Sequence, residues 1–260
     1  MLVALCAVCA VLGLCIGSFL NVVIWRVPRA ESVLRPPSHC PSCAHPIRPW
    51  DNVPVVSWLV LRGRCRHCGV AISARYPLVE TGTAALFVTM AIRFGFDAAL
   101  PAFLYLSAVG LALALIDIDH KRLPFALTVP SYPVALLLLG AAAVIGGHPR
   151  RLIPMLGGMV GLLAFYFLLN LVSPRGMGFG DVMLAGILGL YLGYLGWGPL
   201  LVGAFLGFVL GAVGGLLFIA LGRGGRKSHI PFGPYMLAGA LVAVLAGHEL
   251  ARAYVHTTLS

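Results

Sequence analysis

The sequence predicts an all-α polytopic membrane protein with about eight transmembrane helices. Of its 260 residues, 60% are hydrophobic, 10% are charged and only 8 are Asp or Glu, and its mean hydropathy is +0.98. A soluble core of this size cannot enclose so much apolar surface. A transmembrane helix requires roughly 17 to 25 mostly apolar residues. Segments of this kind lie near 2-25, 78-95, 99-116, 125-146, 152-172, 181-197, 199-221 and 233-254.

The first of these segments has the length of a signal peptide but lacks its charge. No Lys or Arg precedes Arg26, so the positive n-region of a secretory signal is missing. We therefore expect a retained helix.

The basic residues predict how the helices are oriented. With eight crossings, 14 of the 18 Lys and Arg fall on one side, which the positive-inside rule assigns to the cytoplasm. The remaining four are Arg93, Arg150, Arg151 and Arg252; the richer side holds Arg26, Arg29, Arg35, Arg48, Arg62, Arg64, Arg66, Arg75, Lys121, Arg122, Arg175, Arg223, Arg226 and Lys227. Both termini are then outside, and the hydrophilic insertion from about Arg26 to Tyr76 is cytoplasmic.

The net charge of +10 indicates contact with anionic lipid head groups. No basic helix, aromatic stacking platform or nucleic-acid fold motif accompanies the charge. We expect membrane lipids as partners and no nucleic acid.

The insertion contains two CxxC pairs, Cys40 with Cys43 and Cys65 with Cys68, separated by 21 residues. Four thiolates at such spacing suit a closed, tetrahedral structural zinc site. A disulfide is less favoured in the reducing cytoplasm, and an unmetallated loop with reduced thiols is the remaining alternative. His39, His45 and His67 lie nearby, but four sulfurs already complete the tetrahedron.

Two aspartates stand at the ends of apolar segments, where carboxylates are rare and mark candidate functional sites. Asp117 precedes a short polar stretch that also holds Asp119, and Asp181 ends the run Gly-Met-Gly-Phe-Gly-Asp. Two predicted helices separate Asp117 from Asp181, so both lie at the same membrane face and can meet. Each also has an ordinary interpretation: Asp117 as an interfacial cap or ion-pair partner, Asp181 as a helix N-cap.

Several motifs in order make the chain resemble the bacterial type IV prepilin peptidases. They are Gly17-Ser-Phe-Leu-Asn-Val-Val-Ile-Trp-Arg-Val-Pro28, the two CxxC pairs, Arg75-Tyr-Pro-Leu-Val-Glu80, the Asp117 segment and the GxGD motif that ends at Asp181. The resemblance covers almost the whole chain. It implies a GxGD-type membrane aspartic protease of the bacterial inner membrane that removes leaders from prepilins or type II secretion pseudopilins. Many family members also N-methylate the new terminus with S-adenosylmethionine.

The family pattern implies which residues act. One catalytic aspartate lies seven residues before the proline of a Leu-Pro pair, which selects Asp117 over Asp119, and the other is Asp181, within an active-site loop that includes Gly178 and Gly180. The family commonly has Asp or Asn after Leu-Pro, whereas this chain has Phe125. Three parts follow: a first transmembrane helix (1-25), a cytoplasmic tetracysteine domain (26-76) and a seven-helix membrane aspartic peptidase core (77-260).

Other assignments stay open at this level. Glu80 binds substrate or cofactor, or pairs with Arg75. No glycine-rich nucleotide loop of a soluble methyltransferase is present, so a peptidase without methyl transfer is an alternative. A proton- or cation-coupled transporter that uses Asp117, Asp181 and Glu80 is another. The sequence leaves the oligomeric state undefined.

Overall fold

The computed structural model describes residues 1–173, 177–221 and 231–259. The described residues are predominantly helical and include no β-strand, as predicted. The chain divides into two compact units, one of residues 1–96 with 103–112 and one of residues 97–102 with 113–260. Four basic residues of the orientation argument, Arg175, Arg223, Arg226 and Lys227, lie outside the described residues.

Helices occupy the eight predicted segments to within a few residues. Six are long and apolar enough to cross a membrane: Leu2–Arg29, Leu100–His120, Phe125–Ile145, Pro149–Val172, Trp197–Ala220 and Gly233–Thr257. The helix Phe179–Leu195 is apolar but shorter. The helix Arg75–Phe94 has 20 residues and is not among the six, since it carries charged residues at both ends and within it.

The structure corrects one local prediction. The helix α4 (Leu100–His120) continues through the polar stretch after residue 116 and ends where Lys121 adopts a left-handed conformation. Asp117 and Asp119 therefore lie on the last helical turn and not in a loop. The two side chains differ in environment, because Asp117 is buried whereas Asp119 is exposed.

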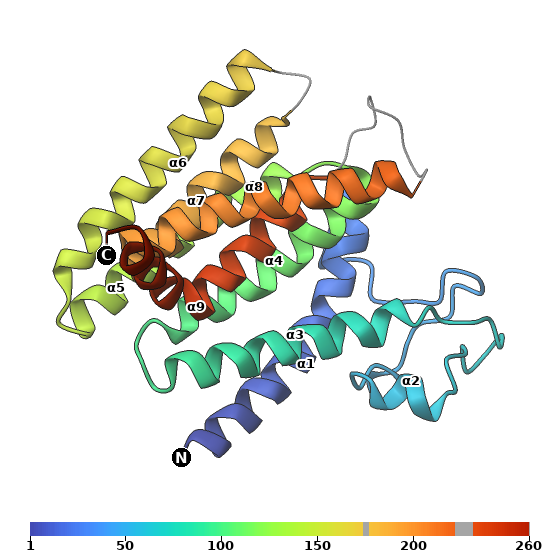
Figure 1. Ribbon diagram of the computed structural model, residues 1–260. Coiled ribbons are helices and arrows are strands. Elements are labelled where there is room, and N and C mark those ends of the chain that lie inside the picture. Colours follow the sequence, from blue (N-terminus) through green and yellow to red (C-terminus); the bar gives the residue numbers. More distant parts are fainter. Residues whose placement is uncertain (174–176, 222–230, 260) are drawn as a thin grey trace. The chain divides into compact units, whose positions relative to one another are not determined.

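In the first unit, α1 (Leu2–Arg26) and α3 (Arg75–Phe94) run side by side (Figure 1). Glycine permits the close approach: a Cβ on Gly13 would lie 2.6 Å from the Ala84 Cα, and one on Gly17 would lie 2.6 Å from the Glu80 Cα. The insertion between these helices contains only the short α2 (Val56–Val60) and two single 3₁₀ turns, Val27–Arg29 and Pro49–Asp51.

In the second unit, α5 (Phe125–Ile145), α6 (Leu152–Val172), α7 (Phe179–Leu195), α8 (Trp197–Ala220) and α9 (Gly233–Leu259) pack together. Figure 1 shows α6 beside α7 and α8 beside α9. The helix α7 is the buried centre, with every residue from Leu184 to Tyr194 buried. Small residues allow this packing, as a Cβ on Gly158 would meet the Gly189 carbonyl 2.5 Å away.

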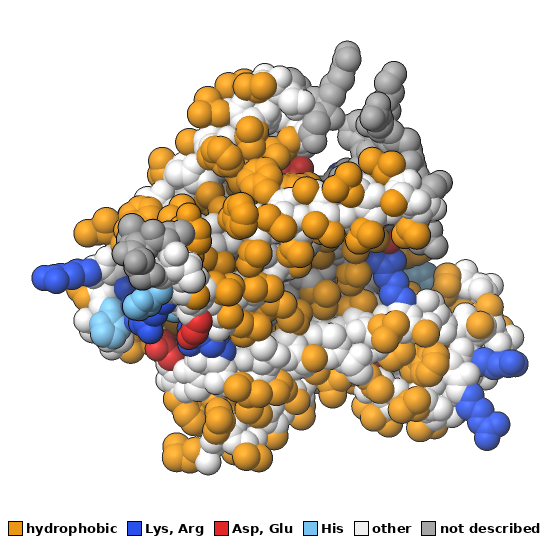
Figure 2. Space-filling model, viewed as in Figure 1, with side chains coloured by type: hydrophobic (Ala, Val, Ile, Leu, Met, Phe, Trp, Pro, Cys, Tyr) orange, Lys and Arg blue, Asp and Glu red, His pale blue; other side chains and the backbone are white. Residues whose placement is uncertain are grey.

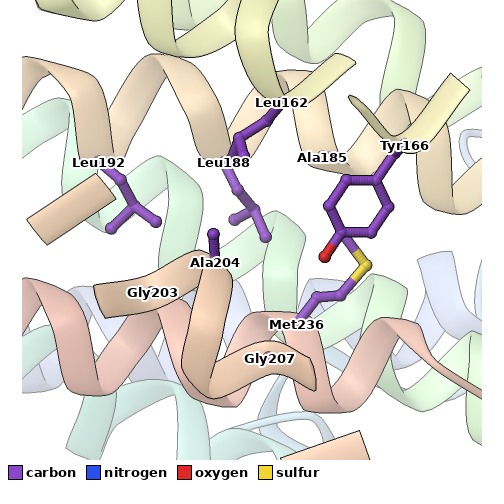
Figure 3. A pocket seen from close by; sticks show the side chains of 9 residues that line it. All are labelled: Leu162, Tyr166, Ala185, Leu188, Leu192, Gly203, Ala204, Gly207 and Met236. Atoms are coloured by element: carbon purple, nitrogen blue, oxygen red, sulfur yellow. The ribbon is translucent and has the colours of Figure 1, made fainter. Parts of the chain in front are cut away.

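A small void lies among four of these helices. One void of about 10 Å³ lies among apolar side chains of α6, α7, α8 and α9, and Tyr166 and Met236 meet at its edge (Figure 3). Such a void holds at most about one water molecule. It is a packing defect and not a substrate site.

Apolar side chains also cover the outside of the helices (Figure 2). On α8, Leu201, Phe205 and Leu216 are each 68–69% exposed. Such surface is costly in water and favourable in hydrocarbon. The distribution agrees with a multi-pass membrane protein.

Candidate functional site

The two CxxC segments form the same hairpin twice, 25 residues apart. The Cys40 N–H donates to the His45 carbonyl (2.9 Å), and the Cys65 N–H donates to the Val70 carbonyl (2.9 Å). The bridge His39↔Pro46 is matched by Arg64↔Ala71. The turn needs a left-handed residue, which is Ala44 (φ 56°) in the first copy and Gly69 (φ 71°) in the second. Each hairpin therefore presents its two sulfurs in the same way.

The four sulfurs fit a tetrahedral metal. The Sγ atoms of Cys40, Cys43, Cys65 and Cys68 all lie within 4.8 Å of one another, and those of Cys40 and Cys68 are 3.8 Å apart. Zinc–sulfur bonds of about 2.3 Å give a tetrahedron whose edge is about 3.8 Å. Backbone N–H groups of Cys43 and then Ser42 hold the pKa of the Cys40 thiol at about 6, below its usual range, which favours the thiolate that binds metal.

Side chains connect the hairpins with each other and with the segment between them. The Arg66 guanidinium donates to both carboxylate oxygens of Asp51, from Nε at 3.0 Å to each and from a terminal nitrogen at 2.6 Å to one. This contact, by hydrogen bonding first, holds the pKa of Asp51 below its usual range. The rings of His45 and His67 stack with centroids 3.4 Å apart. The Trp58 indole donates to the Ile72 carbonyl (3.1 Å).

Asp117 is buried in the second unit, where a helix N-terminus contacts its carboxylate. Its carboxylate is 4% exposed and accepts a hydrogen bond of 3.0 Å from the N–H of Gly233, the first residue of α9. A helix N-terminus carries free N–H groups and the positive end of the helix dipole, both of which favour an anion. A Cβ at position 233 would come within 2.9 Å of this carboxylate oxygen, so a larger residue there would displace the carboxylate or the start of α9.

Asp181 lies on the first turn of α7 and is half-buried. Its carboxylate accepts from the Gly178 N–H at 3.1 Å, and its own N–H donates to the Gly178 carbonyl at 3.0 Å. The Asn170 side chain at the end of α6 donates to the Met177 carbonyl (2.7 Å). Asp181 is thus the third residue of the helix, and its carboxylate caps the N–H of Gly178, which is itself the N-cap residue.

Leu123 links the surroundings of the two aspartates. A Cβ on Gly180 would lie 2.8 Å from the Leu123 Cβ, and one on Gly233 would lie 3.3 Å from a Leu123 methyl. The N-terminal ends of α7 and α9 thus both contact this one buried side chain. The charges of Asp117 and Asp181 also act on each other. The structure brings both carboxylates into one region of the second unit.

The position where this chain departs from the family pattern has a packing role. The ring of Phe125 meets the ring of Phe179 edge to face, with centroids 6.1 Å apart. Phe179 is the variable residue of the GxGD motif, and it also meets Phe167 (6.4 Å). An aromatic contact therefore surrounds position 125 in this chain.

Glu80 belongs to the other unit. Its side chain is buried, and one oxygen accepts from the Val55 N–H at 2.7 Å. It thereby anchors the insertion to α3.

The sequence did not single out two neighbours of the aspartates, Leu123 and Tyr166. The Pro-Phe-Gly-Pro segment that contains Gly233 resembles a family segment and was a candidate to line the site, although such a segment more often marks a turn before a helix. Tyr166 on α6 is buried and interacts electrostatically with Asp181. Its sequence context is a uniformly apolar helix, which contains no signal for such a role.

Comparisons with known proteins agree with this description. A model of the bacterial peptidase A24 N-terminal domain matches residues 11–94, and a model of the type IV leader peptidase family matches residues 104–216. No solved structure matches.

Relatives cover nearly the whole chain, and each is named prepilin leader peptidase/N-methyltransferase. A protein of Stutzerimonas stutzeri is 38% identical over 96% of this chain and 93% of its own length. One from Pseudomonas aeruginosa is 37% identical over 94% and 91%, and one from Aeromonas salmonicida is 38% identical over 95% and 92%. The chain therefore belongs to the type IV leader peptidase family.

Proposed function

We propose that this membrane protein is a prepilin leader peptidase whose catalytic pair is Asp117 and Asp181. The observation that carries the assignment is the buried Asp117 carboxylate on the N-terminus of α9, with Asp181 at the start of α7 and Leu123 between the two helix ends. Asp119, two residues away, is exposed on the same turn. Family membership supplies the substrate class.

The pair suits peptide hydrolysis because two neighbouring carboxylates hold one proton between them. The ionised member removes a proton from water, whose oxygen then bonds to the scissile carbonyl carbon. The protonated member donates its proton to the carbonyl oxygen. When the tetrahedral intermediate collapses, the carbon–nitrogen bond breaks and the leaving amine takes up a proton.

The remaining assignments concern the insertion and the membrane. Cys40, Cys43, Cys65 and Cys68 would hold a structural zinc ion, which fixes the insertion and takes no part in hydrolysis. The insertion and both aspartates lie on the cytoplasmic side, as the distribution of basic residues favours. S-adenosylmethionine, when bound, supplies the methyl group for the amine that leader cleavage releases.

Co-expression with a prepilin tests the catalytic pair. Asp117→Asn and Asp181→Asn should each reduce leader removal by about 10²–10⁴-fold, since each deletes a proton-transfer group. Asp119→Asn is the matched control and should process at close to the wild-type rate. Cleavage that persists in either of the first two variants would contradict the assignment. Mass spectrometry of the mature pilin would distinguish the two forms of the enzyme. A bifunctional enzyme leaves an N-terminus that is heavier by about 14 Da, the mass that one methylation adds, whereas a peptidase alone leaves it unmodified.

A further inference from the structure

The first unit contains a cavity of about 390 Å³ that neither the aspartates nor the tetracysteine site uses. One wall is a single face of α1, on which Cys15, Ser18, Phe19, Val22 and Arg26 recur at intervals of three or four residues. The other wall comes from the insertion, in the ranges 33–38 and 52–54. The volume falls within the about 300–1,000 Å³ of small-molecule sites.

Arg26 is a buried cation in the wall of this cavity. It is only 9% exposed, and two of its nitrogens donate to the carbonyls of Ser32 (3.0 Å) and Pro36 (2.8 Å). No carboxylate pairs with it among the described residues. The two carbonyls orient the guanidinium but leave its charge uncompensated, and a buried charge without a partner is unfavourable. An anionic group bound in the cavity would complete this site.

A buried carboxylate lies behind the same cavity. Glu80 accepts from the Val55 N–H (2.7 Å), and its side chain also hydrogen-bonds to Ser18. Ser18 and Pro54, the neighbour of Val55, both line the cavity. The cavity therefore has a positive charge in its wall at Arg26 and a buried carboxyl group behind its wall near Ser18. This arrangement suits a ligand that carries both an anionic group and hydrogen-bond donors.

We propose that this cavity binds S-adenosylmethionine, with the ligand's carboxylate held by Arg26. The amino acid part of this molecule has a carboxylate, which is complementary to Arg26, beside an ammonium, which can donate hydrogen bonds toward Ser18 and the carboxyl group of Glu80. Its adenosine part is flat and partly apolar, which suits a wall that contains Phe19 and Val22. The inference rests on the proposed methyl transfer and gives that activity a donor site in the first unit.

Calorimetric titration of the purified, detergent-solubilised protein with S-adenosylmethionine tests the site. We expect Arg26→Gln to weaken binding at least tenfold, and Val22→Trp, which places a large side chain in the cavity, to abolish it. Matched controls lie outside the cavity: Arg29→Gln at the same helix end and Val8→Trp on the exposed face of α1. Both controls should bind as the wild type does. Equal affinity in all five proteins would overturn the proposal.

Photo-crosslinking of the wild-type protein with methyl-labelled S-adenosylmethionine gives a second readout that needs no substitution. Label on peptides within residues 15–54 supports the site, whereas label confined to other peptides overturns it. A phospholipid phosphate is the other source of an anion for Arg26. Mass spectrometry that finds a phospholipid retained by the wild type but not by Arg26→Gln, without binding of S-adenosylmethionine, assigns the cavity to lipid.

These outcomes are distinct from failure of the peptidase assignment. A wild-type protein that removes leaders but does not bind S-adenosylmethionine contradicts the cavity proposal alone. Leader removal by Asp117→Asn contradicts the proposed catalytic pair, whatever the titration shows.

Discussion

The tetracysteine insertion and the helical unit around α7 are held together by different forces. Within residues 27–74, all of which the structure describes, Cys40 is the single buried apolar side chain. In α7, by contrast, an uninterrupted run from Leu184 to Tyr194 is buried. The insertion therefore lacks a hydrophobic core and depends on its metal site, its hairpins and a few polar contacts. The aspartates lie in the helical unit, which depends on packing. Substitutions that unfold the insertion should therefore leave the helical unit folded, and the reverse should also hold.

The largest difference between the insertion and the helical unit is expected when the four cysteines can no longer bind a metal. Cys40→Ser together with Cys43→Ser, or treatment with a strong chelator, should unfold the insertion, because structural zinc sites supply about 10–16 kcal/mol in small domains. Limited proteolysis should cut within 30–74 while the helices that follow stay intact. Cys6→Ser together with Cys15→Ser is the control, since these thiols lie on α1. Unchanged proteolysis after complete removal of zinc would contradict a metal-dependent insertion.

A methyl group added beside the aspartates should have the opposite effect. Gly233→Ala brings a Cβ to 2.9 Å from the Asp117 carboxylate and 3.3 Å from Leu123. Displacement of catalytic groups by about 1 Å costs on the order of 10²-fold in rate, so leader removal should fall about 10–100-fold with the insertion unaffected. Gly161→Ala, whose Cβ would meet nothing within 4 Å, should keep the wild-type rate. Equal rates for the two variants would show that the Gly233 contact is not needed.

The pH dependence of cleavage should also belong to the helical unit. Below the lower apparent pKa of the pair both carboxylates are protonated and no base remains. Above the upper one both are ionised and no acid remains, so the rate of leader removal should rise and then fall with pH. The profile should be the same after Arg66→Ala, which changes only the insertion. A rate that rises to a plateau would indicate that only one ionisation controls cleavage.

The smallest effect is expected for the contact between the second hairpin and the turn Pro49–Asp51. Arg66→Ala removes the bonds to Asp51, whose side chain is 10% exposed while that of Arg66 is 47% exposed. Exposed ion pairs contribute little, and outer partners of metal sites change affinity by about 10–100-fold, so competition with a chelator should show zinc affinity lowered by about tenfold at most. Arg64→Ala is the control. A loss as large as that from Cys40→Ser would mean that this ion pair is essential for the fold.

The sequence predicted the helices and the cysteine cluster because both depend on residues that are close together in the chain. Apolar runs located the helices, and the spacing of Cys40, Cys43, Cys65 and Cys68 predicted the clustered sulfurs. The contact of Asp117 with Gly233 spans 116 residues, and no periodicity specifies which helix end meets a given carboxylate. The sequence placed the end of α4 too early because the last turn of this helix is polar. The turn is nevertheless helical, with Asp117 buried and Asp119 exposed. Arg26 was counted only as a loop charge, whereas the insertion folds over it.

Leu123 has a consequence for how this chain can vary over time. Its side chain fills the space that both Gly180 and Gly233 leave open, so these three positions pack together, although Leu123 and Gly180 are 57 residues apart and Gly180 and Gly233 are 53 residues apart. A Cβ at position 180 would lie 2.8 Å from the Leu123 Cβ, which every residue except glycine carries, so a smaller side chain at 123 would not relieve that contact. A Cβ at position 233 would lie 2.9 Å from the Asp117 carboxylate as well as 3.3 Å from a Leu123 methyl, so a smaller residue at 123 would relieve only the second contact. Substitutions that enlarge position 180 or 233 should therefore stay rare among descendants of this sequence, whichever residue stands at 123.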